Sequence, residues 1–473
     1  MLFSVLPLKP VFAQTETDSV TADSATYIVR SVSYEGNKTT KAFILEREMM
    51  LKAGDTLTGA RLLTLAEQSR KNLLNTSLFN FVTVQANCPR DTLLPPCKEV
   101  DVLVSVKERW YTWPAPIFEV AEQNINTWYR NGRNLKRASY GFFLWRYNFR
   151  GRKESIALIC RFGYAQQFGG QYSVPYLNKK KTLGVTFTGT YTRSHEIAYS
   201  TENNQLLFFK DRGRFIRGET SASIRFSYRQ AIYVNHTLDF RYTDLTVGDT
   251  VTVLSPDYFT GGKTRMQYLS ISYHVVRDCR DIKAYPLKGH LEELEITKNG
   301  LGLLKDEKLD FMFVAVSLRK YLELVPRWFG AGMVRARWLP GALPPYYHQR
   351  ALGFGPYVRG YEYYVIDGQS YVMGKISVRY QLLKPHIYRF PFIPLEKFNT
   401  LHLALYTGLF ADAAYVQDRA SLPAEGNTLG NTTLFGYGAG LDIVTYYDIA
   451  IRLEYAFNRL GEDGFFMHLG AAF

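Results

Sequence analysis

The sequence predicts a mainly β protein, in which one small α+β domain with the order βααββ precedes a 16-stranded antiparallel transmembrane β-barrel. Three observations support this prediction. Aromatic residues make up 15% of the 473 residues and charged residues 21%, a balance that suits amphipathic strands at a membrane interface. No run of about 18 apolar residues occurs, so a membrane crossing would need a closed barrel. From Trp110 to the end of the chain, apolar and polar residues alternate with a period of two.

Residues 1–25 are predicted to be the remainder of a secretory signal peptide followed by a polar linker. The stretch MLFSVLPLKPVFAQTETD is apolar up to Ala13, a small residue typical of a cleavage site, but it lacks the basic start of a full signal. A trimmed start would explain this lack. A buried N-terminal strand is the alternative, and Pro7 and Pro10 disfavour it.

Residues 26–108 are predicted to form the small domain. The strand-like run YIVRSVSYEGN ends in a Gly36-Asn37 turn, and KAFILEREMM has helical spacing. A longer helix, ARLLTLAEQSRKNLLN, and the strands LFNFVTVQA and KEVDVLVSVKE follow. A domain of about 80 residues can bury one small core.

Four cysteines are present, and Cys88 and Cys97 enclose the proline-rich loop CPRDTLLPPC of the small domain. In an oxidising compartment this spacing would close a small loop by a disulfide, whereas without export two free thiols are expected. Cys160 and Cys279 lie far apart in strand-like runs and are interpreted as small packing residues.

Residues 109–473 are predicted to form the barrel. The even number of strands fits bacterial single-chain barrels, and charged residues opposite aromatic ones fit a polar lumen and a lipid-facing wall. A pair of soluble β-sandwiches would also alternate, but its apolar faces would lack partners at this length. The sixteen alternating segments begin near residues 112, 137, 154, 169, 182, 215, 233, 264, 287, 308, 328, 369, 400, 433, 447 and 463.

The net charge is +14, from 57 Lys and Arg against 43 Asp and Glu. Such a charge suits an acidic surface but does not by itself distinguish nucleic acid from anionic lipid. Because a barrel is predicted, outer-membrane lipid and lipopolysaccharide are the expected partners, and nucleic acid is not.

Three stretches carry a family resemblance: GFGPYVRGYEYY at 353–364, RDCRDIKAYPLKGHLEELEI at 277–296, and TGLFADAAYVQD at 407–418. They resemble motifs of the BamA/TamA-type outer-membrane protein insertase and translocase superfamily. Residues 26–108 resemble its polypeptide-transport-associated (POTRA) domain, so the resemblance covers nearly the whole chain. The sequence departs from the family motif at Ala413 and Ala414, where glycine is common, and from the usual C-terminal signal of bacterial outer-membrane barrels at His468, where that signal tends to have glycine.

The resemblance implies that the loop carrying Arg359 folds back into the barrel and that Arg359 pairs with Asp412. A guanidinium in a lumen needs fixed acceptors, and its planar fork suits a carboxylate. An exposed Arg359 that contacts lipopolysaccharide is the alternative. The expected lumen-loop latch consists of Val358, Arg359, Gly360, Tyr361, Phe410 and Asp412.

A weak lateral seam is predicted between the first and last barrel strands. The first strand contains TWPAPIFEV, in which two prolines cannot donate backbone hydrogen bonds. The resemblance implies that this junction opens laterally, and an aromatic residue at the C-terminus is the usual ending of such barrels. The expected seam residues are Trp113, Pro114, Pro116, Phe465, Met467, Leu469 and Phe473.

The resemblance implies outer-membrane protein assembly, insertion or translocation through this seam, by a specialised or accessory member because only one POTRA-like domain is seen. The expected location is the bacterial outer membrane, with the POTRA-like domain in the periplasm. The expected partners are unfolded outer-membrane or secreted client proteins, and periplasmic or lipoprotein partners at the POTRA-like domain. A passive porin-like channel and a dedicated secretion translocator for one client protein are the alternatives.

No catalytic constellation is predicted. The patterns GxSxG and HExxH are absent, and FTGGKT at 259–264 has Asp257 where a phosphate loop needs its first glycine. The scattered histidines have no metal-ligand spacing. We therefore expect no enzymatic activity, no cofactor and no bound metal.

Overall fold

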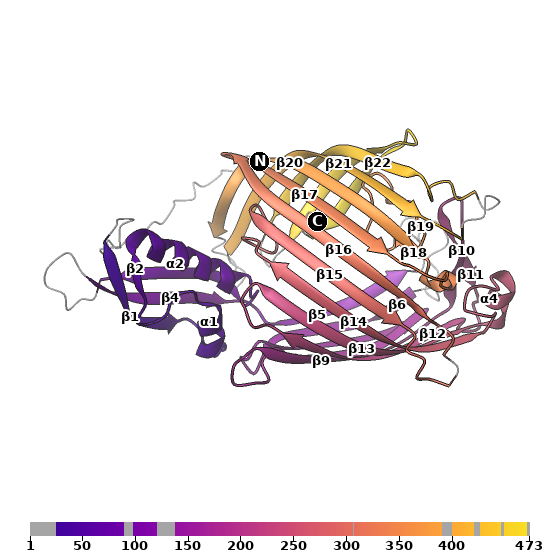
Figure 1. The fold of residues 1–473 in the computed structure, drawn as a ribbon, viewed down its shortest axis with the longest axis horizontal. Coiled ribbons are helices and arrows are strands. Elements are labelled where there is room, and N and C mark those ends of the chain that lie inside the picture. The colour runs from indigo at the N-terminus through magenta and orange to yellow at the C-terminus, as the bar shows by residue number, and fades with distance from the viewer. Residues whose placement is uncertain are drawn as a thin grey trace, which may run out of the picture. The chain divides into compact units, whose positions relative to one another are not determined.

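The computed structural model describes residues 25–88, 98–120, 138–305, 307–389, 400–420, 426–445 and 449–470. The chain divides into two compact units, Met1–Glu108 and Arg109–Phe473, called here the N-terminal unit and the barrel unit (Figure 1). The expected signal peptide, Cys97 and Phe473 lie outside the described residues. None of the helices in the described ranges is long and apolar enough to cross a membrane.

The N-terminal unit packs two helices against a four-stranded sheet with the order β2-β1-β4-β3. Strands β1 and β4 are parallel, and β3 pairs with β4 in the antiparallel direction. The short strand β2 was not predicted, because its three residues are too few to show alternation; it forms by pairing with the first residues of β1. The elements are β1 (Thr26–Glu35), α1 (Ala42–Glu48), β2 (Thr56–Thr58), α2 (Gly59–Leu74), β3 (Phe79–Asn87) and β4 (Glu99–Glu108).

Helix α2 illustrates how the sequence builds this unit. The side chain of Thr58 caps the helix by accepting a hydrogen bond from the backbone of Arg61 at 3.4 Å. Apolar residues three to four positions apart then place Leu62, Leu65 and Leu73 on one buried face. Burial of this face against the sheet supplies the core expected for a domain of this size.

The barrel unit is built on a sixteen-stranded antiparallel sheet, as predicted. Most strands begin within three residues of their predicted positions; β8 begins four residues early, because Gly169 and Gly170 interrupt the alternation there. The strands are β5 (Thr112–Val120), β6 (Ala138–Phe149), β7 (Glu154–Gly163), β8 (Ala165–Val174), β9 (Leu183–Ser194), β12 (Arg217–Tyr228), β13 (Val234–Val247), β14 (Arg265–Asp278), β15 (Gly289–Asn299), β16 (Phe311–Val325), β17 (Trp328–Trp338), β20 (Ser370–Arg389), β21 (Thr400–Gln417), β22 (Thr433–Val444), β23 (Ala450–Asn458) and β24 (Asp463–Leu469).

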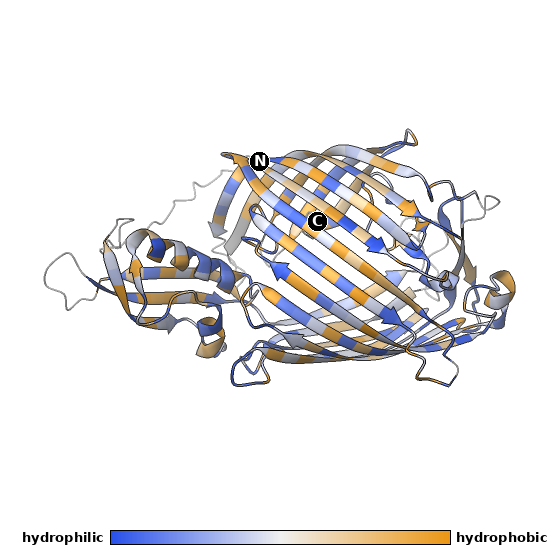
Figure 2. Cartoon of the chain, viewed as in Figure 1, coloured by the Kyte–Doolittle hydropathy of each residue, from blue (hydrophilic) through white to orange (hydrophobic). Residues whose placement is uncertain are grey.

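Alternate residues of these strands face opposite sides of the wall. In β12, Ile224 and Phe226 are exposed on the outer face, whereas Ser221 and Ser223 are buried on the inner face. Figure 2 shows this alternation of hydrophobic and hydrophilic residues along the barrel strands. An apolar outer surface and a polar lumen are the pattern of a membrane-spanning barrel.

The two ends of the barrel differ. Because neighbouring strands are antiparallel and even in number, β5 begins and β24 ends at the same end, called here the terminal end. The opposite end, the loop end, carries the long connections. These contain β10 (Glu196–Glu202), β11 (Gln205–Lys210), α4 (Asp249–Leu254), η2 (Tyr346–His348), β18 (Arg350–Leu352) and β19 (Ile366–Asp367).

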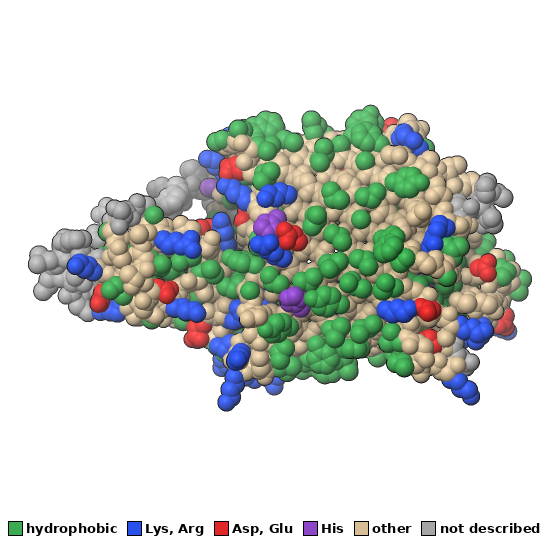
Figure 3. Space-filling view, in the orientation of Figure 1, with side chains coloured by type: hydrophobic (Ala, Val, Ile, Leu, Met, Phe, Trp, Pro, Cys, Tyr) green, Lys and Arg blue, Asp and Glu red, His purple; other side chains and the backbone are tan. Residues whose placement is uncertain are grey.

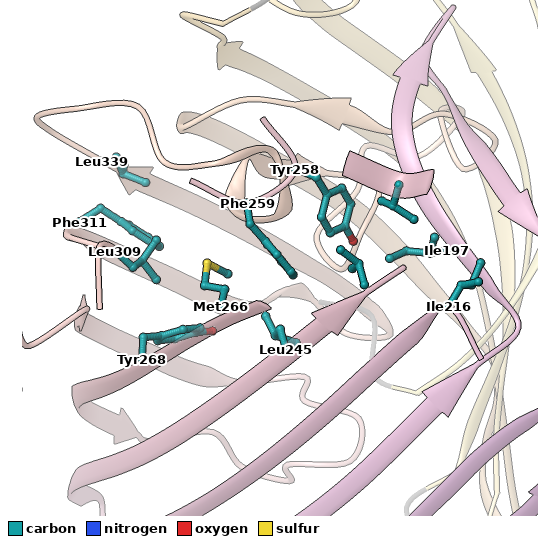
Figure 4. Close-up of a cluster of buried hydrophobic side chains, with 12 residues drawn as sticks. Ile197, Ile216, Leu245, Tyr258, Phe259, Met266, Tyr268, Leu309, Phe311 and Leu339 are labelled. Atoms are coloured by element: carbon teal, nitrogen blue, oxygen red, sulfur yellow. The ribbon is translucent and has the colours of Figure 1, made fainter. Parts of the chain in front are cut away.

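Buried apolar residues join several long loops near the loop end (Figure 4). Side chains from the connections around 195–216, 248–264, 300–310 and 339–369 pack on inward-facing residues of β13, β14 and β16. Tyr258 and Phe259 are about 1% exposed at the centre of this group. The members of this loop-end cluster are Ile197, Ile216, Leu245, Val247, Val251, Tyr258, Phe259, Met266, Tyr268, Leu309, Phe311 and Leu339.

Candidate functional site: a lumen loop held on the barrel wall

The connection between β17 and β20, residues 339–369, brings Arg359 onto the inner face of the wall. The backbone N–H of Arg359 donates to Oδ2 of Asp412 at 3.0 Å. Its side chain donates through Nε to Oδ2 at 2.9 Å and through Nη2 to Oδ1 at 2.5 Å. Arg359 is 2% exposed and Asp412 1%, so this two-pronged ion pair is shielded from water and geometrically specific.

Phe410 and Asp412 hold opposite parts of the same guanidinium. They lie two residues apart on β21 and therefore face the lumen together. The Cζ atom of Arg359 lies 3.8 Å from the centre of the Phe410 ring, within the range of a cation–π contact. The ring covers one face of the guanidinium while the carboxylate fixes its edge.

Further charged residues on β20 and β23 complete the site. Glu454 of β23 accepts from Nη1 of Arg359 at 3.2 Å, and Nζ of Lys375 on β20 lies 3.4 Å from Oδ2 of Asp412. Nη1 of Arg452 lies 3.5 Å from Oε1 of Glu454. Buried charges are stable only when each has opposite partners, and here three cations alternate with two carboxylates. We call Arg359, Lys375, Phe410, Asp412, Arg452 and Glu454 the lumen charge cluster.

Sequence reasoning missed Lys375, Arg452 and Glu454 as site residues. Alternation along β23 places Arg452 and Glu454 together on its polar face. Charged residues at lumen-facing positions of β20, which pairs with β21, and of β23, two strands away on the other side, were thus a signal available in the sequence. Strand register was needed to bring them to one height, as in the pairing of Lys375 with Asp412.

Two glycines allow the loop to lie directly on the wall. Gly360 has φ +90°, and a Cβ there would come within 2.8 Å of the Phe457 carbonyl oxygen. Its carbonyl accepts from Nδ2 of Asn458 at 2.8 Å. On the wall, a Cβ at Gly436 would lie 1.9 Å from the carbonyl oxygen of Arg359. Any side chain at Gly436 would force the loop backbone away from β22.

Val358 and Tyr361 anchor the same turn through apolar contacts. Both are 2% exposed and belong to a buried cluster that includes inward-facing residues of β20, β21 and β22, such as Met373 and Val416. The hydroxyl of Tyr361 also accepts from the backbone of Arg459 at 3.3 Å. Packing on both sides of Arg359 fixes where its guanidinium can reach.

The loop also contacts the last strand. The Tyr357 ring stacks on His468 of β24 with ring centres 5.2 Å apart. The Tyr357 hydroxyl lies 3.3 Å from Nδ1 of His468. Nε2 of His468 lies 3.4 Å from Glu454. His468, which departs from the usual C-terminal signal of outer-membrane barrels, therefore links β24 to the lumen charge cluster.

The predicted seam residues lie on the two end strands of the sheet order, β5 and β24. Tyr111 accepts from the backbone of Tyr147 at 2.7 Å, so odd-numbered residues of β5 direct their backbone groups toward β6. Pro114 and Pro116 are paired with Leu144 and Phe142 of β6, and their amide nitrogens face the opposite edge. The prolines thus remove two donors from the edge of β5 that is remote from β6.

On the other end strand, Gly470 donates to Ala450 of β23 at 2.8 Å. Even-numbered residues of β24 therefore bond to β23, and the backbone groups of Phe465, Met467 and Leu469 face the free side. The side chains of these three residues are 62–73% exposed. Within the described residues, no ladder pairing joins β5 to β24.

The remaining predicted positions lie away from these sites. Cys88 is disulfide-bonded, and Cys97 lies outside the described residues. Cys160 and Cys279 are free. Across the described ranges, no group of three or more His, Cys, Asp or Glu side chains could hold a metal ion.

Comparisons with known proteins agree with this architecture. Residues 148–473 match the Omp85 superfamily domain, and residues 27–109 match the POTRA family described as a surface antigen variable number repeat. No curated protein matches the chain. The fold resembles that of BamA from Haemophilus ducreyi lacking POTRA domains 1–3, with TM-score 0.51 and 16% identity over 94% of this chain and 84% of the other. It also resembles CdiB from Escherichia coli, with TM-score 0.52 and 14% identity over 94% of this chain and 75% of the other.

Proposed function

The chain belongs to the Omp85 superfamily, and from that premise we propose that it inserts or translocates polypeptides at the bacterial outer membrane through the seam between β5 and β24. The observation that carries the proposal is the pair of prolines, Pro114 and Pro116, whose nitrogens face the closing edge of β5. Each missing backbone hydrogen bond lowers the stability of that edge by about 1 kcal/mol. Separating two strands of the wall therefore requires the least free energy at this seam.

A separated seam would expose two strand edges to a client polypeptide. Unpaired strand edges bind extended segments by β-augmentation, with main-chain hydrogen bonds supplying affinity. Unfolded outer-membrane or secreted proteins are the proposed clients. No cofactor and no catalytic step is part of this mechanism.

The lumen charge cluster would act as a latch in this mechanism. Arg359 fixes the loop to β21 and β23, and Tyr357 of the same loop stacks on His468 of β24. The loop thereby holds the last strand in line with the rest of the wall while β5 moves. Its proposed role is structural, and Arg359 is neither a catalytic residue nor a substrate ligand.

The N-terminal unit would lie in the periplasm and receive clients or lipoprotein partners. Its sheet ends at β2 and β3, and β3 with nine residues is the longer edge strand. A strand of this length can template an added strand.

A passive porin-like channel is the rival function. It would explain the polar lumen, but it gives no role to the loop held by Arg359 or to the loop-end cluster, both of which occupy the barrel interior. Single-channel recording separates the two functions. A wide, steadily open pore that is unaffected by Arg359→Ala would favour the porin.

A seam lock tests the leading proposal. Cysteines at Trp113 and Gly470 would be oxidised to a disulfide in cells depleted of the native protein, and the outer membrane would then be inventoried by proteomics. The locked protein should fail to restore client proteins, and reduction should recover them. The matched control, Phe118→Cys with Tyr140→Cys, ties β5 to β6 at directly paired residues and should leave function intact.

The same inventory distinguishes the kinds of client. Loss of many barrel proteins on depletion would indicate assembly, whereas loss of one surface protein would indicate a dedicated secretion translocator. Full restoration by the oxidised seam lock, with the cross-link verified on a gel, would exclude lateral opening.

A further inference from the structure

A groove of about 730 Å³ runs along the outer face of the barrel wall. Its floor consists of residues with little or no side chain, Gly332, Gly374, Ala411 and Ala413 on β17, β20 and β21. Strand register places Gly374 beside Ala413. Small residues on adjacent strands lower the surface locally, and the larger neighbouring side chains form the sides.

The groove opens to the membrane and not to the lumen. Val334 and Ile376, which line its sides, are 53% and 63% exposed. Their sequence neighbours Met333 and Lys375 are buried on the inner face. Since successive residues of a strand point to opposite faces, the groove lies on the lipid-facing side of the wall that carries Asp412 inside.

Three basic side chains stand at one end of the groove. Arg277, His290 and Lys320 lie on β14, β15 and β16 and all line it. Register places His290 directly beside Lys320, and Lys320 beside Gly332 of the floor. Figure 3 shows basic, acidic and His side chains gathered on the otherwise apolar face of these strands.

The charges in this group do not cancel. Glu292 supplies the carboxylate of this group. Its Oε2 lies 3.5 Å from Nη1 of Arg277, and its Oε1 lies 3.8 Å from Nε2 of His290. Among the described residues, Lys320 has no ion-pair partner within 4.0 Å. Two permanent cations and a histidine against one carboxylate leave a net positive site that suits an anionic group.

The position of these cations along the barrel corresponds to a lipid headgroup level. Arg277 is the next-to-last residue of β14, and His290 is the second residue of β15. Both therefore lie at the terminal end, while the apolar groove extends toward β20 and β21. Charged side chains on the outside of a barrel are tolerated near the interface and are costly at the bilayer centre.

We propose that this groove binds one glycerophospholipid of the membrane leaflet at the terminal end. Lys320 and Arg277, aided by His290, hold its phosphate, and one acyl chain lies over Gly332, Gly374, Ala411 and Ala413. The groove volume falls within the range of about 300–1,000 Å³ of small-ligand sites. The binding would be selective for this position, unlike the general contact of lipid with a barrel wall.

Native mass spectrometry of the full-length protein in detergent tests this site. The probes are palmitoyl-oleoyl phosphatidylglycerol and the diacylglycerol with the same chains, which lacks the phosphate. The wild type should retain one phosphatidylglycerol and bind it at least about tenfold more tightly than the diacylglycerol. The double variant Arg277→Gln with Lys320→Gln should lose about tenfold or more, because each basic side chain near a membrane surface contributes several-fold to binding an anionic lipid.

A second variant tests the groove without changing its charge. Ala413→Leu fills the floor from an exposed, lipid-facing position and should weaken binding to a similar extent. Lys298→Gln is the matched control, because Lys298 lies on the same face of β15 near the loop end. Retention of phosphatidylglycerol by Lys298→Gln should equal that of the wild type, and the shifted gel mobility of unheated samples should show that every variant folds.

Three outcomes would overturn the proposal. Equal phosphatidylglycerol retention by the wild type and the double variant would mean that only general wall lipid is bound. Equal binding of the diacylglycerol would remove the role of the phosphate. A wild-type dimer that Ala413→Leu abolishes would assign the groove to a second copy of this chain.

Discussion

Tyr285 donates a hydrogen bond to the carboxylate of Asp442, a residue 157 positions later in the chain. Tyr285 lies in the turn between β14 and β15 at the terminal end, whereas Asp442 faces the lumen from β22. The Arg379 side chain of β20 lies 3.4 Å from the same carboxylate. The turn at the terminal end and the loop from the loop end are therefore both fastened to β20–β23.

Loss of the Arg359 guanidinium should strongly destabilise the barrel. Arg359→Ala would leave Asp412 and Glu454 as buried carboxylates that have lost a cationic partner. The free energy of unfolding should fall by about 3–5 kcal/mol. Equilibrium unfolding in urea, followed by gel mobility of the unheated protein, would measure this. Arg212→Ala, at an exposed loop position, is the control and should change stability by no more than about 0.5 kcal/mol.

Exchanging the two charges should restore part of that loss. In the variant Arg359→Asp with Asp412→Arg, the ion pair is re-formed in reverse. Rescue should remain partial because the new arginine at 412 would face Lys375, and the new aspartate at 359 would face Glu454. An exchange variant no more stable than either single variant would show that the pair does not act as a unit.

Gly436→Ala should displace the lumen loop while every charged side chain of the site is retained. The added Cβ would lie 1.9 Å from the carbonyl oxygen of Arg359, and overpacking of this kind costs about 1–3 kcal/mol. Limited proteolysis within residues 353–364 would report release of the loop. Gly189→Ala provides the control, because a Cβ at Gly189 meets nothing within 4 Å; equal proteolysis of both variants would contradict the close approach.

Tyr285→Phe should loosen the turn at the terminal end while the lumen charge cluster stays in place. The substitution removes a buried hydroxyl that donates to Asp442 and should cost about 1–3 kcal/mol. Hydrogen exchange would detect faster exchange in residues 279–288. Tyr363→Phe, at a position 69% exposed, should change nothing, and unchanged exchange in Tyr285→Phe would mean that the hydrogen bond contributes no stability.

Acid should weaken the N-terminal unit through Asp101. Hydrogen bonds from Arg30 and Ser31 lower the pKa of the Asp101 carboxyl below its usual value. The stabilisation is therefore present above the unfolded pKa of about 3.9 and is lost as the pH falls through the folded pKa. Because both partners are partly exposed, the effect should be below about 1 kcal/mol.

Hydrogen exchange of β1 and β4 in the full-length protein, measured from about pH 5 downward and corrected for intrinsic rates, would show this loss of protection. Asp101→Asn should already be less protected at pH 5 and should lose less on acidification. An identical pH dependence in the wild type and Asp101→Asn would assign the effect to other carboxylates.

The barrel strands could be predicted from the sequence because each has one face in lipid and one in a polar lumen, which imposes a period of two. Short strands such as β10, β11, β18 and β19 could not be predicted. Their pairing is set by contacts among the loops, as in the packing of Ile197 within the loop-end cluster, and their few residues carry no sustained pattern.

Only part of the lumen charge cluster could be predicted from the sequence. Arg359, Phe410 and Asp412 were identified through family motifs, which specify residues two positions apart on one strand. Lys375 and Glu454 depend on the register of separate strands, and a shift of one residue would turn either side chain to the lipid. The groove beneath Ile376 depends on small residues that meet only once the strands are aligned.

The loop-end cluster has a consequence for the face that would point away from the cell. Loops from four connections share one buried core, so a change to an inward residue of one loop, such as Tyr258, alters the shape presented by the others. A binder raised against this end would recognise a composite surface and not a single loop peptide. A substitution at an outward position, such as Val253, which is 78% exposed, changes the recognised surface without disturbing the shared core.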